Sequence, residues 1–266
     1  MRRAALAAAL LTVLLAGAAV EAGMADRIGA TFSLMADDFI QAFNPVEAIV
    51  VAVDNDEIFL DVGAGRGAQV GQEYTIFRKG AVFSHPLTGK ALGRYEEVLG
   101  YAQVRRVESD FAAATFVPAP DKPRPIPEDG ARITRGRLKV AVTPVIDMTD
   151  GRADVRRVPY LIATVLERSK RFQVVDPLAV SDMFATGSVR VEEVLARPER
   201  AVRVAKNLDV AGWIVPVLLA TRGTVALDIT YISAITGAPL FSRRVSVLPT
   251  SELEGQRFPW EPRMED

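Results

Sequence analysis

The stretch LKVAVTPVIDMTDG (Leu138–Gly151), followed shortly by RRVPYLIATVLERSKRFQVVDP (Arg156–Pro177), decides the fold of the second half of this chain. An apolar β-branched run ends in a polar turn at Asp147–Gly151, an amphipathic helix follows, and a second strand, Phe172–Val175, stops at Asp176-Pro177. The hydrophobic period therefore changes from that of a strand to that of a helix and back. The sequence predicts a β-α-β unit of about forty residues, and its polar residues form no catalytic set.

The rest of residues 128–248 extends this unit. Two further helices are predicted, over Pro177–Ala185 and Val191–Leu208. Three strands are then predicted over Gly212–Ala220, Thr224–Ala234 and Pro239–Leu248, the last after a tight turn at Thr236-Gly237. The order β-α-β-α-α-β-β-β predicts a mixed sheet with helices packed against it.

The first half of the chain has a different pattern. Apolar residues at helical spacing predict a helix over Arg27–Phe43, which Asn44-Pro45 ends. Short strands with glycine-containing turns follow, which is typical of a small antiparallel barrel or sandwich. The strands are predicted at Ala48–Val53, Glu57–Val62, Gln72–Arg78, Tyr95–Val107 and Phe111–Val117, with loops at Gly63–Gly71 and Phe83–Gly93. The fold class predicted for the whole chain is α+β.

Proline marks the predicted boundary between the two halves. The segment Val117–Pro127 has five prolines in eleven residues, a composition that favours an extended, semi-rigid spacer. The predicted organisation is a helix plus barrel over residues 24–117, a linker over 118–127 and an α/β domain over 128–248. Residues 249–266 lack an apolar period and are predicted to be disordered.

The N-terminus has the pattern of a secretory signal. Met1-Arg2-Arg3 is basic, Ala4–Val20 is apolar but Ala-rich, and Val20-Glu21-Ala22 places small residues around a cleavage site. We therefore expect residues 1–22 to be removed near Ala22 and the mature chain to be exported to the periplasm. A retained N-terminal anchor is the alternative.

Composition excludes several classes of chemistry. The chain contains no cysteine and one histidine, which rules out disulfides and thiolate sites and makes a transition-metal site improbable. Without residues 1–22 it has 30 basic and 32 acidic residues, so nothing marks it as a nucleic-acid-binding protein. We expect no catalytic residue, no cofactor and no metal, and hence no enzyme.

Three patterns that can carry chemistry are better explained by structure. His85 precedes Pro86 in a loop, without a carboxylate to orient it. The run Gly63–Ala68 matches the dinucleotide fingerprint, but a strand follows it where the fingerprint requires a helix. Acidic residues at 54, 56 and 61 fit a hairpin turn, and those at 147, 150 and 154 fit a cap of the next helix.

Two segments carry a resemblance to a known family. The LKVAVTPVIDMTDG pattern, with its RSKRF helix end and AVRVAKNLDVAGWIV, resembles the TolB N-terminal fold, as in the middle domain of flagellar assembly protein T. Gly67–Gly71, Pro86–Gly89 and Leu92–Gly100 resemble motifs of that family's C-terminal SH3-like barrel. Flagellar assembly protein T carries its barrel last, whereas this chain carries it first. The resemblance implies a periplasmic part of the flagellar basal-body ring built from the two modules in swapped order.

The sequence thus predicts a non-enzymatic periplasmic scaffold or assembly protein that binds envelope or flagellar basal-body proteins, is associated with the outer membrane, and forms homo-oligomers. Phe258 and Trp260 are the predicted partner-binding residues, because aromatic anchors dominate interface energies; folding back onto the same chain is their alternative. The strands Ala48–Val53 and Val245–Leu248 are candidate edges for a partner strand. The alternative functions are a secretion or peptidoglycan-synthase-activator component of the outer membrane, and a small-ligand-binding protein or hydrolase.

Overall fold

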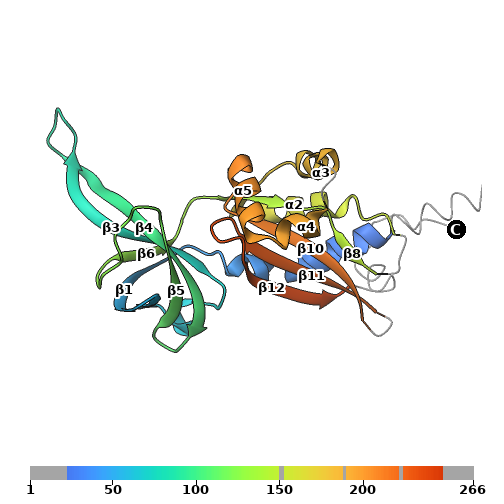
Figure 1. Ribbon diagram of the computed structural model, residues 1–266, viewed down its shortest axis with the longest axis horizontal. Coiled ribbons are helices and arrows are strands. Elements are labelled where there is room, and N and C mark those ends of the chain that lie inside the picture. Colours follow the sequence, from blue (N-terminus) through green and yellow to red (C-terminus); the bar gives the residue numbers. More distant parts are fainter. Residues whose placement is uncertain (1–22, 150–152, 188–189, 222–223, 248–266) are drawn as a thin grey trace, which may run out of the picture. The chain divides into compact units, whose positions relative to one another are not determined.

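The computed structural model describes residues 23–149, 153–187, 190–221 and 224–247. It confirms the predicted α+β class (Figure 1). Contacts divide the chain into two compact units. The barrel unit consists of Asp38–Leu138 with Pro239–Phe241. The α/β unit consists of the other described residues, within 23–37, 139–238 and 242–247.

A closed antiparallel barrel forms the first of these units. Its strands hydrogen-bond in the order β1-β2-β5-β4-β3-β6. Their bounds are β1 Val46–Asp54, β2 Glu57–Leu60, β3 Glu73–Ser84, β4 Ala91–Val107, β5 Ala112–Pro118 and β6 Gly130–Ile133, and a 3₁₀ turn, η1, covers Ala64–Arg66. Because β1 pairs with both β2 and β6, the prediction that Ala48–Val53 is a free edge was wrong: closing a barrel pairs both sides of its strands.

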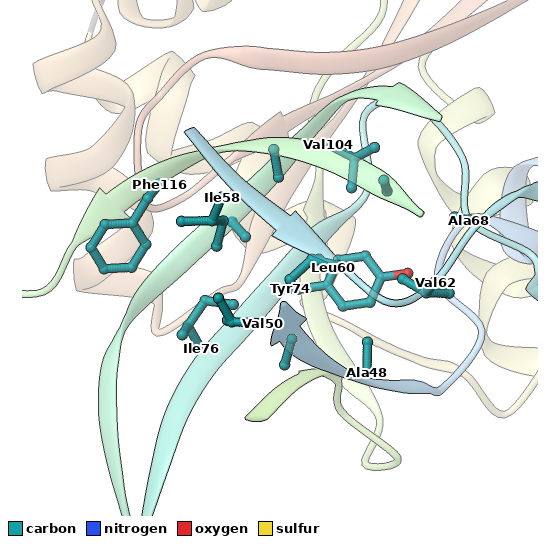
Figure 2. Packing of buried hydrophobic residues seen from close by; sticks show 14 of the residues in the cluster. Ala48, Val50, Ile58, Leu60, Val62, Ala68, Tyr74, Ile76, Val104 and Phe116 are labelled. Atoms are coloured by element: carbon teal, nitrogen blue, oxygen red, sulfur yellow. The ribbon is translucent and has the colours of Figure 1, made fainter. Parts of the chain in front are cut away.

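The barrel core explains why its strands alternate. Apolar side chains at every second position point inward and are fully buried, among them Val50, Ile58, Leu60 and Ile76 (Figure 2). Burying a side chain of this kind stabilises the fold by roughly 1.5–3 kcal/mol. Tyr74 lies in the same cluster and its hydroxyl donates to Oε1 of Gln72 at 3.0 Å, and burial raises the pKa of this tyrosine to about 12.

The proline-rich segment 118–127 lies within the barrel unit, between β5 and β6. Arg124 donates to the carbonyl of Asn55 at 2.9 Å and to Asp56 at 3.0 Å. The amide of Ile126 donates to the carboxylate of Asp129 at 2.8 Å. These bonds hold the segment against the barrel that it follows.

The α/β unit is built on a mixed sheet. Its strand order is β12-β11-β10-β7-β9, with β8 beside β10; β10 is parallel to β7 and β8 and antiparallel to β11. The strands are β7 Leu138–Val142, β8 Ile146–Met148, β9 Phe172–Val174, β10 Gly212–Thr221, β11 Thr224–Ser233 and β12 Pro239–Ser246. The helices are α2 Val158–Arg168, α3 Pro177–Thr186, α4 Val191–Leu195 and α5 Pro198–Leu208, and a further helix covers residues 23–41.

Proline divides what the sequence predicts to be one helix over Val191–Leu208. The structure has α4 and α5 in its place, and Arg197 between them is extended, with φ −118° and ψ 102°. A residue before proline avoids the α region, so Arg197 ends the first helix and Pro198 begins the second. Asp176 behaves as a cap should: its carboxylate accepts from the amide of Leu178 at 2.9 Å.

The predicted capping of α2 by acidic residues was wrong. The residue at its N-cap is Arg157, without a side-chain cap. Asp154 pairs instead with Arg156, which lowers the pKa of this carboxyl to about 2. Asp147 lies in β8, where its carboxylate accepts from the amide and hydroxyl of Thr149, and Asp150 lies outside the described residues.

Trp213 is the largest fully buried side chain of the α/β unit. Its ring meets that of Phe184 edge-on, with 6.3 Å between centroids. Its indole nitrogen donates to the carbonyl of Ala201 at 3.2 Å, so the tryptophan joins β10, α3 and α5. No described helix combines the length and apolar character needed to cross a bilayer.

Candidate interaction surface

A long β-hairpin extends from the barrel (Figure 1). Strand β3 pairs with β6 only over Thr75–Phe77, and β4 pairs with β5 only over Gly100–Val107. Residues 79–98, here called the arm, lie beyond those limits. They form the hairpin, and at its root Glu97 and Val98 pair with Arg78 and Phe77. The predicted loop over Phe83–Gly93 was therefore wrong, because the strands continue to Ser84 and resume at Ala91.

His85 builds the turn at the tip of the arm. Its amide donates to the carbonyl of Lys90 at 2.8 Å, and its own carbonyl accepts from the amide of Gly89 at 2.9 Å. Its Nδ1 accepts from the amides of Leu87 and Thr88 at 3.2 and 3.3 Å. This histidine thus has a structural role in the turn.

Two aromatic side chains share one face of the arm. Phe83 lies opposite Gly93 in the register, and Tyr95 is two residues further along β4 on the same face. The two ring centroids are 5.1 Å apart, and the ring of Phe83 also covers Gly93, whose Cβ would approach it to 3.2 Å. Tyr95 is nevertheless 65% exposed, so the pair is ordered but open to solvent.

Exposed apolar side chains are concentrated on the arm. Of the fifteen large hydrophobic side chains exposed in the described part of the chain, six fall within its twenty residues: Val82, Phe83, Leu87, Leu92, Tyr95 and Val98. Leu87 at the tip is 89% exposed. Single exposed apolar residues are normal on protein surfaces, but a cluster of them marks an interaction site.

Charged pairs fix the root of the arm on the barrel. Arg78 donates to both carboxylate oxygens of Asp129, at 2.8 and 2.7 Å, and this bond raises the pKa of Arg78. Arg132 pairs with Glu96 at 2.6 Å, and its guanidinium lies 4.3 Å from the centre of the Phe77 ring. Because these contacts join the arm to β6 and to the segment before it, the arm is held at a defined position on the barrel.

Each strand of the arm has an outer edge. The pairings of the described residues place no third strand beside 79–84 or 91–98. Backbone amides and carbonyls on an unpaired edge are a template for another strand. The arm can therefore offer a partner both aromatic side chains and backbone hydrogen bonds.

Outside the arm, the other candidates for a site are groups of metal-ligand side chains and cavities. The described residues contain no group of three or more His, Asp or Glu side chains placed to hold a metal ion. One open cavity of about 460 Å³ lies along α5, and another of about 230 Å³ lies between the helix of residues 23–41 and α2. The run Gly63–Ala68 forms the turn η1 before β3, the arrangement predicted in place of a nucleotide site.

The predicted partner-binding residues, Phe258 and Trp260, lie outside the described residues, and their role stays a prediction. The predicted edge at Val245–Leu248 falls in part on β12, which is an end strand of the mixed sheet. Phe83 and Tyr95, the two aromatic residues of the arm, are not among the residues that the sequence predicts to bind a partner. Aromatic residues on both sides of a turn that also has a proline and a glycine are the signal that could have identified a hairpin.

Comparison with known proteins gives matches of structure only. No family model and no curated protein matches the chain. Among solved structures it is similar to the LpoB C-terminal domain from Salmonella enterica, with a TM-score of 0.37 and 16% identity over 44% of this chain and 86% of that one. It is also similar to lipoprotein GNA1162 from Neisseria meningitidis, with a TM-score of 0.37 and 14% identity over 44% of this chain and 88% of that one. The PelC dodecamer from Paraburkholderia phytofirmans matches with a TM-score of 0.28 and 15% identity, over 45% and 80%.

These matches correct the family resemblance. The structures named are LpoB domains, a lipoprotein and PelC rather than flagellar assembly protein T, so the predicted resemblance to that protein was wrong. The flagellar role depended on this resemblance and is left without support. The physical reason is that a strand, an acidic turn, a helix and a second strand form a supersecondary motif that many unrelated proteins share.

Proposed function

We propose that this chain is a non-enzymatic, exported component of the cell envelope that binds a protein partner through the arm of its barrel. The observation that carries the proposal is the exposed Phe83–Tyr95 pair on a hairpin whose root is fixed by the Arg78–Asp129 bonds. Ordered aromatic anchors lose little conformational entropy on binding and contribute most of an interface's energy.

The partner that suits the arm best is an extended segment of another protein. Such a segment adds to an open strand edge through backbone hydrogen bonds and fits alternate side chains against the face beneath. On this arm the face holds the aromatic pair, and the tip holds Leu87. Basic residues at Lys79, Lys90 and Arg94 would favour a segment with acidic side chains.

Of the roles predicted from the sequence, we retain the outer-membrane one: a component of a secretion or peptidoglycan-synthase-activating assembly. The expected export signal supports a place in the envelope, and the flagellar role is withdrawn with the resemblance on which it depended. The arm and the paucity of catalytic groups in the described residues favour a binding protein over the hydrolase alternative.

Replacing both aromatic residues, Phe83→Ala with Tyr95→Ala, is expected to weaken partner capture by about 1,000-fold, since each interface anchor contributes on the order of 2 kcal/mol and about 1.4 kcal/mol is tenfold in affinity. The measurement is affinity purification of the mature chain from envelope extracts, with the principal co-purified protein quantified and then titrated in purified form. The melting temperature should stay within about 2 °C of the wild type, because both side chains are largely outside the core.

Ile126→Ala is the matched control, since Ile126 is an exposed apolar side chain of the segment between β5 and β6 and belongs to neither strand of the arm. This change should leave capture unaltered. Equal loss of capture in both variants, or full capture by the doubly substituted arm, would refute the role of the aromatic pair.

A further inference from the structure

A groove lies along one face of α5 in the α/β unit. It has a volume of about 460 Å³ and is lined from the turn after β11 by Ile235 and Thr236, and from the helix by Pro198, Glu199, Val202, Arg203 and Lys206. Positions 198, 202 and 206 are successive turns of one helix face. The groove therefore follows the helix and is not a gap at its end.

The turn beside the groove is packed tightly against the start of α5. Gly237 has φ +68°, and a Cβ there would lie 2.3 Å from the carbonyl oxygen of Pro198. Only a glycine allows the turn to come this close. Because this contact fixes Ile235 and Thr236 beside the helix, the apolar floor formed by Val202 and Ile235 is a built feature of the fold.

The helix beside this floor is basic. Arg197, Arg200, Arg203 and Lys206 are all exposed, and within the described residues none of them has an ion pair. Glu199 is the only carboxylate among residues 197–206, which carry a net charge of +3. An apolar floor flanked by cations suits an acidic segment that has an apolar anchor.

We propose that the occupant of this groove is the chain's own segment Pro249–Asp266, which lies outside the described residues. Its sequence, PTSELEGQRFPWEPRMED, has five acidic and two basic residues, a net charge of −3 that complements the +3 of the helix. Phe258 and Trp260 supply the apolar anchors, and they are separated only by Pro259. The groove and this segment form an intramolecular docking pair, distinct from the arm.

The length of the segment is sufficient. Strand β12 runs back along β11: Ala238 accepts from Ser233, and Val247 donates to Val225 at the other end. Its eight residues carry the chain about 26 Å from the turn, at about 3.3 Å per residue. From Val247 to Phe258 the chain has eleven residues, which extend to about 36 Å, so the aromatic residues reach back to the groove.

Tryptophan fluorescence tests the docking directly, because the chain has only two tryptophans and Trp213 is fully buried. If Trp260 is docked, quenching by acrylamide of the full chain should be close to that of a chain ending at Leu248. The variant Arg203→Glu/Lys206→Glu should release the segment and raise the quenching constant about threefold or more, because like charges then face each other. The control Arg168→Glu/Lys170→Glu makes the same charge change around the end of α2 and should leave quenching unchanged.

A second measurement separates docking from loss of folding. A labelled peptide of residues 249–266 should bind the chain ending at Leu248 and should bind the full chain about tenfold or more weakly, because the tethered segment competes. A Trp260→Ala peptide should lose this binding. Equal quenching in all full-length variants, or equal peptide binding to the full and the truncated chain, would overturn the proposal.

Two further results separate docking within one chain from docking onto a second copy, and separate this proposal from that of the arm. Docking within one chain does not depend on protein concentration. If the protection of Trp260 from acrylamide disappears on dilution, the segment docks onto a second copy of the chain, and the intramolecular proposal is overturned. The variant Phe83→Ala/Tyr95→Ala should leave Trp260 protected, so failure of the arm proposal would not affect this result.

Discussion

Asp129→Ala should destabilise the barrel unit by about 2–4 kcal/mol, since it removes a nearly buried carboxylate and the charge-assisted hydrogen bonds that this carboxylate accepts. The side chain of Asp129 is only 4% exposed. It accepts two hydrogen bonds from Arg78 and one from the amide of Ile126. The substitution thus removes three part-buried hydrogen bonds and the anchor of the arm at once.

Urea denaturation followed by circular dichroism measures this change, and hydrogen exchange locates it. Exchange in β3 and in the arm should accelerate, because Arg78 joins β3 to the segment before β6. The matched control is Asp56→Ala, since Asp56 pairs with Arg124 through side chains that are 76% and 66% exposed. Exposed pairs contribute about 0–1 kcal/mol. If Asp129→Ala lowers the free energy of unfolding no more than Asp56→Ala does, the role assigned to the Arg78–Asp129 pair is contradicted.

Trp213→Ala should cost the α/β unit about 3–5 kcal/mol, the range for truncating a large buried aromatic side chain. The loss has two parts: the cavity left beside Phe184, and the hydrogen bond that the indole nitrogen donates to the carbonyl of Ala201. Because this tryptophan joins β10, α3 and α5, we expect the helices to lose protection from hydrogen exchange before the sheet does.

Trp213→Phe is the matched control for this effect. It keeps an aromatic ring beside Phe184 but removes the hydrogen bond and part of the volume, so its cost should be about 1–2 kcal/mol. Both variants are compared by urea denaturation with circular dichroism, which does not depend on tryptophan emission. If both substitutions lower the free energy of unfolding by the same amount, the cavity beside Phe184 is not the main cause of the loss.

The sequence predicts the parts of the fold that depend on local periodicity. The β-α-β unit from Leu138 to Val175 alternates and then changes to helical spacing, so both strands and α2 could be located from it. The break at Pro198 could also have been predicted, because proline restricts the residue before it. Apolar residues at helical spacing on both sides of Arg197 favour one continuous helix, and the sequence therefore predicts no break there.

The arm illustrates what sequence cannot supply. Gly80 and Gly93 lie within its strands, and its register shifts between Lys79 and Val82 and again after Phe83. A strand is predicted from the alternation of polar and apolar residues, and bulges disturb this alternation. The sequence of the arm therefore looks like that of a loop. Phe83 and Tyr95 face solvent because the barrel does not extend along the arm: β6 stops pairing with β3, and β5 with β4, before these residues are reached. The sequence does not show where this pairing stops.

The candidate site differs from the sequence prediction for a related reason. The sequence predicts partner binding at Phe258 and Trp260, because they are aromatic residues in a segment without an apolar period. It places Phe83 in a loop and Tyr95 in a barrel strand. Exposure of an aromatic residue is a property of tertiary structure, and neither spacing nor composition reports it.

Site-resolved photo-crosslinking tests the central claim, that the arm binds a protein partner, most directly. A photoreactive amino acid would replace Leu87 at the tip of the arm or, as the control, Ile126 on the barrel, in cells that carry an intact envelope. We predict one discrete protein adduct at position 87 that is absent at position 126 and is lost when Phe83→Ala and Tyr95→Ala are added. The same adducts at both positions, or an adduct at 87 that survives loss of both aromatic residues, would contradict the account.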